Sequence, residues 1–154
     1  MLEDQNSSNS MQLLKAMRYY YNKAKVLFNI RILGSVGVPL LSISIEILRY
    51  KEIISIDLTW LFALLGSLWL LVFFILGLYE SKHIECGAKI QEEFDTNIFK
   101  LSWNGILIGD RVSPEDILDN ASKYSGDLNK LRNWYGGLIS NKHYLNVILA
   151  QRSN

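Results

Sequence analysis

The chain alternates between polar segments and two long apolar runs. The longer run, residues 58–79, reads LTWLFALLGSLWLLVFFILGLY and has no charged residue between Asp57 and Glu80. As a helix it would extend about 33 Å, which matches a bilayer core about 30 Å thick. A buried core helix rarely avoids every charge for about six turns. The run therefore predicts a transmembrane helix.

A second apolar run, residues 32–48, lies between Arg31 and Arg49 and has a length near the lower limit for spanning. Glu46 falls near one end, where its cost is below the roughly 2.5–3.5 kcal/mol of an acid at a helix centre. Pro39 removes one backbone hydrogen bond, which membrane helices tolerate. The run predicts a second spanning helix. Neither run is a signal peptide, because the first starts too late and no small-residue cleavage site follows it.

The distribution of lysine and arginine predicts the orientation. Five basic residues and no acid occupy residues 11–31, namely Lys15, Arg18, Lys23, Lys25 and Arg31. The loop at residues 49–57 holds Arg49 and Lys51 beside two acids. The positive-inside rule then places the N-terminus and residues 80–154 in the cytoplasm and the loop outside. The single cysteine, Cys86, can form no intrachain disulfide, which agrees with a reducing cytosol.

The polar segments before and after the hairpin predict a small helical domain. Residues 1–10 are expected to be disordered, and residues 11–31 form an amphipathic juxtamembrane helix. That helix either lies on the anionic inner leaflet or packs on the cytoplasmic part. Beyond Tyr79 the second spanning helix continues, and its apolar spacing predicts an inward stripe of Ile84, Gly87, Gln91, Phe94, Ile98 and Leu101.

Start signals mark later elements. SPED, Ser113 to Asp116, predicts a helix with a serine N-cap that ends at Ser125-Gly126. Four residues of that helix are expected to face inward: Ile117, Leu118, Ala121 and Tyr124. Residues 127–135 predict a short helix, and residues 140–154 begin another that ends without a closing signal. The predicted fold is an all-α membrane protein, a transmembrane helical hairpin with a small cytoplasmic helical domain at residues 80–154.

Candidate chemistry is sparse. The sequence has no phosphate-binding glycine loop and no nucleophile elbow, and His83 with Cys86 supplies only two metal ligands. His143 is interpreted as a surface or packing residue, and the carboxylates of Glu92, Glu93 and Asp95 as a solvated or salt-bridged face. No basic patch suits nucleic acid. We therefore expect no enzyme activity, no cofactor, no metal and no nucleic-acid partner.

Four short segments resemble the motifs of one family in order and spacing. They are KIQEEFD at residues 89–95, LSWN at 101–104, NWYG at 133–136 and QRSN at 151–154. They resemble the SMODS-associating four-transmembrane (S-4TM) effector family, with Ser102 and Gly136 in place of prolines and Asn133 in place of aspartate. Those departures bear on local loop geometry. The matching site residues are Lys89, Gln91, Glu92, Glu93, Phe94, Asp95, Trp103, Asn104, Trp134, Tyr135, Gln151, Arg152, Ser153 and Asn154.

The resemblance implies a bacterial inner-membrane protein encoded beside a nucleotide second-messenger synthase and acting as a pore-forming effector in antiviral defence. It also implies four membrane helices, of which this chain supplies two, so a second hairpin is expected to follow. The implied partners are the lipid bilayer, further copies of the chain and a cyclic nucleotide or synthase-linked signal. The acidic, aromatic helix at residues 88–104 would be a stalk that couples the cytoplasmic domain to the membrane helices, with Trp103 and Trp134 as packing anchors.

Two hypotheses about function remain open from the sequence. In the first, subunits oligomerise and breach the membrane, with Pro39 as a hinge and Glu46 either lining a pore or lying at the interface. In the second, the protein is a non-conducting membrane-anchored adaptor whose cytoplasmic helices recruit a protein partner. Ion leakage would distinguish the two.

Overall fold

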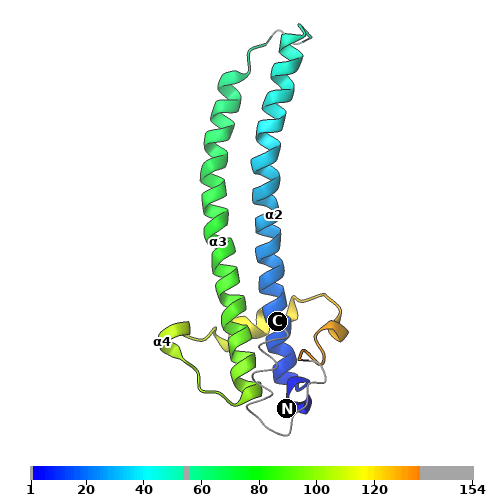
Figure 1. Ribbon diagram of the computed structural model, residues 1–154, viewed down its shortest axis with the longest axis vertical. Coiled ribbons are helices and arrows are strands. Elements are labelled where there is room, and N and C mark those ends of the chain that lie inside the picture. The colour runs from blue at the N-terminus through cyan, green and yellow to red at the C-terminus, as the bar shows by residue number, and fades with distance from the viewer. Residues whose placement is uncertain (1, 54–55, 136–154) are drawn as a thin grey trace. The chain divides into compact units, whose positions relative to one another are not determined.

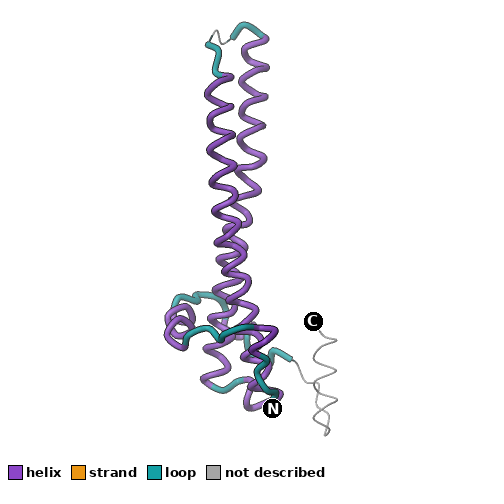
Figure 2. The backbone as a smooth tube through the Cα atoms, turned by 90° about the vertical axis from the view of Figure 1, so that its left-hand side faces the viewer, coloured by secondary structure: helices purple, strands orange, loops and turns teal. Residues whose placement is uncertain are grey.

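The structure is a computed structural model that describes residues 2–53 and 56–135 (Figure 1). All its elements are helices, and no strand occurs in those two ranges (Figure 2). This confirms the predicted all-α class. The elements are α1 (Leu2–Gln5), α2 (Ser8–Tyr50), α3 (Thr59–Phe99), α4 (Gly105–Ile108), α5 (Pro114–Ser122) and the 3-10 helix η1 (Leu128–Lys130).

The chain divides into two compact units, and α2 and α3 contribute to both. The hairpin unit comprises Asn22–His83 and consists of antiparallel stretches of α2 and α3 joined by a loop. The helical unit comprises Met1–Tyr21 with Ile84–Asn154. Within its described residues it holds α1, the start of α2, the end of α3, α4, α5 and η1.

Each of the two long helices is long and apolar enough to cross a membrane, by length and composition. No residue in the most apolar stretch of either helix is buried within the chain, whereas the core helix of a soluble protein would be mostly buried. In water such a surface would be unfavourable, because each large aliphatic side chain left exposed forgoes about 1.5–3 kcal/mol of burial. The exposure favours a lipid environment. The boundaries predicted at 32–48 and 58–79 remain predictions, since both helices extend beyond them.

The core of the helical unit is formed by side chains from segments far apart in the sequence. Leu14 and Met17 of α2, Ile90 and Phe94 of α3, and Leu131 are its largest fully buried residues. The first part of residues 11–31 therefore packs into the protein, which favours that alternative over a helix lying on the leaflet.

The N-terminal residues differ from the expected disorder. Residues 1–10 contain α1 and the beginning of α2, and the side chains of Gln5 and Ser10 are buried. The Ser7 hydroxyl accepts the Ser10 N–H at 3.2 Å, and the Ser10 hydroxyl donates to the Asp4 carbonyl at 2.6 Å. These short polar side chains form hydrogen bonds with backbone groups that are otherwise unpaired at the start of a helix. The polar composition of this segment therefore reflects helix capping and not disorder.

The predicted inward stripe of α3 is correct in its middle and wrong at its ends. Phe94 and Ile98 are buried, and so is the unpredicted Ile90, but Ile84 is 44% exposed and Leu101 is 49% exposed. The helix ends at Phe99, because Lys100 adopts a left-handed backbone conformation (φ 52°). Leu101 therefore lies beyond the helical register on which the prediction depended.

The predicted start of α5 is confirmed. The Ser113 hydroxyl accepts the Asp116 N–H at 3.1 Å, and Pro114 begins the helix. Ile117 and Ala121 are buried as expected, whereas Leu118 is 52% exposed, so that part of the prediction was wrong.

The predicted helix boundaries after residue 122 differ from the structure. The helix α5 ends at Ser122, before the predicted Ser125-Gly126. Residues 127–135 form only the single turn η1, which Asp127 caps by accepting the Asn129 N–H at 2.9 Å. The expected helix at residues 140–154 lies outside the described residues, as does His143.

Candidate functional site

The motif residues from Lys89 to Tyr135 all lie in the helical unit. Gly136 and the predicted site residues Gln151, Arg152, Ser153 and Asn154 lie outside the described residues. The two other predicted site residues, Pro39 and Glu46, belong to the hairpin unit. The predicted site residues therefore belong to both units.

Two of the motifs meet at a partly buried contact between Asp95 and Tyr135. The Tyr135 hydroxyl donates a hydrogen bond to Asp95 Oδ1. The tyrosine ring stacks on Phe94 with centroids 6.1 Å apart and packs against Phe99 at 5.1 Å. The Tyr135 N–H also donates to Gln5 Oε1 at 3.3 Å. The contact thus joins α1, α3 and the segment after η1.

The environment of Asp95 favours its neutral form. Its pKa is raised to about 6, chiefly by burial and to a smaller extent by the charge of Glu92, while the hydrogen bond from Tyr135 acts in the opposite direction. The pKa of Tyr135 also lies above its usual range, because the ring is buried and its hydroxyl bonds the carboxylate. A carboxyl with a pKa near 6 takes up or releases its proton close to neutral pH.

Other side chains of the α3 segment at residues 89–95 contact residues of the helical unit. Lys89 Nζ lies 2.7 Å from Glu85 Oε1, one helical turn away. Gln91 Oε1 accepts a long hydrogen bond of 3.4 Å from the Tyr21 hydroxyl. Phe94 is completely buried. Such contacts fit structural packing of the QEEFD segment.

The Trp103 side chain organises the loop that carries α4. Its indole N–H donates to the Gly109 carbonyl at 3.0 Å, and the Arg111 guanidinium lies 5.0 Å from its ring centroid. Asn104 caps α4 through its side-chain oxygen, which accepts the N–H groups of the second and third helical residues. Arg111 also approaches Glu93 at 3.7 Å, which ties the loop to α3. Trp103 anchors this loop and is not a member of the main core.

Trp134 is the second aromatic motif residue, and it contacts the core directly. It is partly buried against the core cluster, and the Arg18 guanidinium of α2 lies 4.8 Å from its ring centroid. A cation over an indole face is an attractive arrangement. Trp134 therefore fits the predicted role of packing anchor between α2 and the segment after η1.

An interaction that the sequence analysis missed lies in the hairpin unit between Arg31 and Glu80. The two side chains form an ion pair and are only 22% and 14% exposed. The guanidinium also lies 4.1 Å from the centroid of Phe73, and Gly77 makes room for it, since a Cβ there would be 3.3 Å from Arg31 Cζ. Arg31 directly precedes the first apolar run and Glu80 directly follows the second. Their opposite charges at the same end of an antiparallel hairpin were the signal from which the pair could have been predicted.

A second close approach of the two helices involves Gly34 and Trp69. A Cβ added at Gly34 would lie 2.0 Å from Trp69 Cζ2, so only glycine admits the indole ring there. The indole N–H donates to the Ser35 hydroxyl at 3.3 Å. The Trp69 side chain of α3 therefore packs closely against α2 within the charge-free region.

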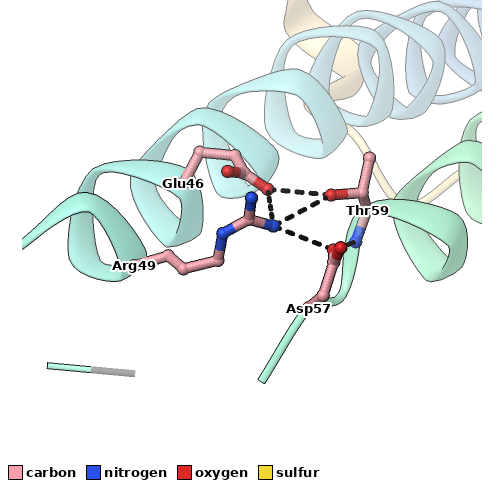
Figure 3. Close-up of polar contacts among 4 residues, drawn as sticks. All are labelled: Glu46, Arg49, Asp57 and Thr59. Atoms are coloured by element: carbon pink, nitrogen blue, oxygen red, sulfur yellow. Dashed lines mark hydrogen bonds and ion pairs between the residues drawn. The ribbon is translucent and has the colours of Figure 1, made fainter. Parts of the chain in front are cut away.

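Glu46 takes part in a polar cluster where the loop joins the helices (Figure 3). Arg49 Nη1 lies 3.4 Å from Glu46 Oε1 and 2.9 Å from Asp57 Oδ1. The Thr59 hydroxyl donates to Glu46 Oε1 at 3.1 Å, and the Thr59 N–H donates to Asp57 at 2.9 Å. Hydrogen bonds from Thr59 are the main cause of a lowered Asp57 pKa. These contacts agree with an interfacial carboxylate at Glu46.

Among residues 2–53 and 56–135, no three His, Cys, Asp or Glu side chains are grouped so that they would hold a metal ion. His83 Nδ1 lies 2.7 Å from the Tyr79 carbonyl in the preceding turn.

A comparison of the sequence with models of protein families shows the family of this chain. The model of the SMODS-associating 4TM effector domain matches residues 1–154, which is the full chain. The chain belongs to the S-4TM family. The resemblance found in the four motifs is thereby confirmed. The S-4TM name counts four transmembrane segments, and this chain supplies two helices of suitable length and composition.

One curated relative is similar to this chain along its whole length. It is a protein of Bacillus cereus (strain VD146) named as a probable CBASS effector molecule, and it is 50% identical over 154 residues. Those residues make up 100% of this chain and 52% of the relative. The chain therefore spans about half the length of the curated relative that it matches. No solved structure matches the chain.

Proposed function

We propose that this chain is the membrane hairpin and helical domain of an antiviral effector that responds to a nucleotide second messenger by oligomerising and opening a pore in the bacterial inner membrane. The observation that carries the proposal is an apolar hairpin whose most apolar stretches bury no residue, in a chain of an effector family. The relative described as a probable CBASS effector supports the link to nucleotide signalling. No catalytic step is part of this function.

The hairpin has the charge pattern expected of a membrane-spanning element. The ion pair of Arg31 with Glu80 lies at one end of its apolar part, and the cluster around Arg49 lies at the other. Between them neither helix carries a charged residue. Charged groups at both ends and none between them suit a slab of hydrocarbon bounded by two polar interfaces.

A pore needs more helices than this hairpin supplies. Two helices cannot enclose a channel, so several subunits, or further helices of the same protein, must contribute. Large apolar residues are exposed on α3 and would be available for such contacts, among them Leu64, Leu68, Leu71 and Ile75. The helical unit, in which Asp95 and Tyr135 join three segments, is then the part that responds to the signal.

The adaptor alternative is favoured by one observation, the exposure of α4. Ile106 is 97% exposed and Leu107 is 82% exposed, although Asn104 and Trp103 hold this turn in place. Two adjacent aliphatic side chains on a capped turn offer apolar surface to another protein. An adaptor would use them to recruit a partner without conducting ions.

The distinguishing experiment measures membrane potential in bacteria that express the full-length protein with its neighbouring nucleotide synthase, active or inactive. A pore predicts depolarisation only with the active synthase, and loss of this effect in Asp95→Ala and Trp103→Ala. Leu118→Ala, at an exposed position of α5, is the matched control and should behave as wild type. An unchanged potential, with the protein confirmed in the membrane and the signal active, would exclude the pore and leave the adaptor.

A further inference from the structure

The two ends of the hairpin unit differ in charge. The end formed by residues 22–31 and 80–83 carries exposed lysines at positions 23, 25 and 82. Its only acid is Glu80, which is paired with Arg31. At the loop end the basic residues Arg49 and Lys51 are outnumbered by acids, namely Glu46, Glu52 and Asp57. One end is therefore distinctly basic and the other is not.

The lysines of the two helices lie at a similar level along the hairpin. Arg31 of α2 packs beside Gly77 of α3, which fixes the register of the antiparallel pair. Lys25 precedes Arg31 by six residues, and Lys82 follows Gly77 by five. At 1.5 Å per residue the two positions are displaced in the same direction by about 9 and 8 Å. Lys23 follows about 3 Å further on.

Apolar side chains reach almost to these lysines. On α2, Val26, Phe28 and Ile30 are 55%, 48% and 44% exposed, and on α3, Leu78 and Tyr79 are 58% and 56% exposed. A surface that changes from exposed aliphatic and aromatic groups to lysines within one or two turns is typical of the boundary between hydrocarbon and headgroups. The lysine ammonium groups would then lie at the depth of the lipid phosphates.

We propose that Lys23, Lys25 and Lys82 form a lysine belt that binds the phosphate groups of anionic lipids in the cytoplasmic leaflet. The ammonium group is a compact cation that pairs with phosphate as a point charge, and its flexible stem lies along apolar surface. A basic juxtamembrane residue typically strengthens attachment to anionic lipid about fivefold. The inference rests on the proposed insertion of the hairpin into a membrane, but not on pore formation.

The test compares lipid binding by the purified full-length protein in a neutral detergent. Native mass spectrometry would count the phosphatidylglycerol and phosphatidylcholine molecules retained at equal added concentration. The test variant replaces all three lysines by glutamine, and the control variant is Lys51→Gln at the loop end. We expect wild type and control to retain phosphatidylglycerol in several-fold preference, and the triple variant to lose most of it, with raised salt having the same effect.

Equal retention of the two lipids by wild type, or an unchanged preference in the triple variant, would overturn the lysine belt. Extraction of cell membranes with alkaline carbonate separates this failure from a failure of the proposed function. A protein that stays in the carbonate pellet but shows no lipid preference is inserted without the belt. A protein released by carbonate contradicts the insertion on which both proposals rest.

Discussion

The hydroxyl of Tyr135 donates a hydrogen bond to the carboxyl of Asp95, forty residues earlier in the chain. One residue belongs to the KIQEEFD motif and the other to the NWYG motif, so two segments that identify the family are in contact. Because the same tyrosine is bonded through its N–H to Gln5, the contact also holds the N-terminal helix α1. A signal that displaced any one of these segments would disturb the other two.

The raised pKa of Asp95 predicts a pH dependence of stability. Its pKa of about 6 in the folded protein exceeds the ordinary aspartate value of 3.8, so the folded state binds the proton more tightly than the unfolded state. The stability from this group is therefore fully present below about pH 4 and is lost as the pH rises through 6. Asp95→Asn removes that loss and should raise unfolding free energy at pH 7.5 by at most about 3 kcal/mol.

Thermal unfolding of the full-length protein in detergent, measured between pH 4.5 and 7.5, checks this. The difference in melting temperature between Asp95→Asn and wild type should widen as the pH rises. A difference that is constant across the range would show that the carboxyl does not titrate near 6.

Removal of the tyrosine hydroxyl should lower the stability of the protein, and by more at high pH than at low pH. Tyr135→Phe keeps the ring that packs on Phe94 but leaves the ionised Asp95 without this donor, at a cost of about 1–3 kcal/mol at pH 7.5. The cost should shrink at pH 5, where the carboxyl is mostly protonated. Tyr79→Phe, at a 56% exposed position, is the control. Equal destabilisation by Tyr135→Phe at both pH values would contradict the interpretation.

The close approach of the helices at Gly34 can be tested with a paired substitution. Gly34→Ala would place a methyl group 2.0 Å from the Trp69 ring and force the indole away from Ser35. Gly37→Ala meets no atom within 4 Å and gains up to about 1 kcal/mol of helix propensity. We expect a lower melting temperature for Gly34→Ala and an equal or higher one for Gly37→Ala. Identical shifts in the two variants would be evidence against the close packing at Gly34.

The ion pair of Arg31 and Glu80 should show strong coupling in a double-mutant cycle. Each side chain is largely buried, so Arg31→Gln or Glu80→Gln alone leaves its partner's charge uncompensated. The double variant should be more stable than the sum of the single effects predicts, by about 1–3 kcal/mol. Arg49→Gln, whose ion pairs are more exposed, is the comparison and should have a smaller effect. Additive effects of Arg31→Gln and Glu80→Gln would rule out the pair as a stabilising contact.

The sequence was most informative where a local pattern determines the structure. The charge-free run before Glu80 predicted a long apolar helix, and SPED predicted the start of α5 at Pro114. Both signals depend on neighbours in sequence. The buried positions of α3 were predicted only in part. The predicted set included Gly87, Phe94 and Ile98, but it omitted Ile90, which lies on the same side of the helix and is buried.

What the sequence missed depends on contacts between distant segments. The pairing of Asp95 with Tyr135 and of Arg31 with Glu80 follows from how helices pack, which no local spacing reveals. The order of residues 1–10 was missed for a related reason. Their polar side chains lower the mean hydropathy, yet Ser7 uses its hydroxyl to cap a helix whose apolar partners lie about eighty residues away.

Cysteine labelling tests the membrane topology, on which the account depends, most directly. In full-length protein freed of all native cysteines, Cys86→Ser among the changes, one cysteine would replace Lys51 in the loop, and in a second variant one would replace Glu115 in α5. A membrane-impermeant maleimide applied to spheroplasts should label position 51 at once and position 115 only after lysis, because both residues are exposed and the proposed topology puts them on opposite sides of the bilayer. Labelling of position 115 in intact spheroplasts, or protection of position 51, would contradict the proposed hairpin.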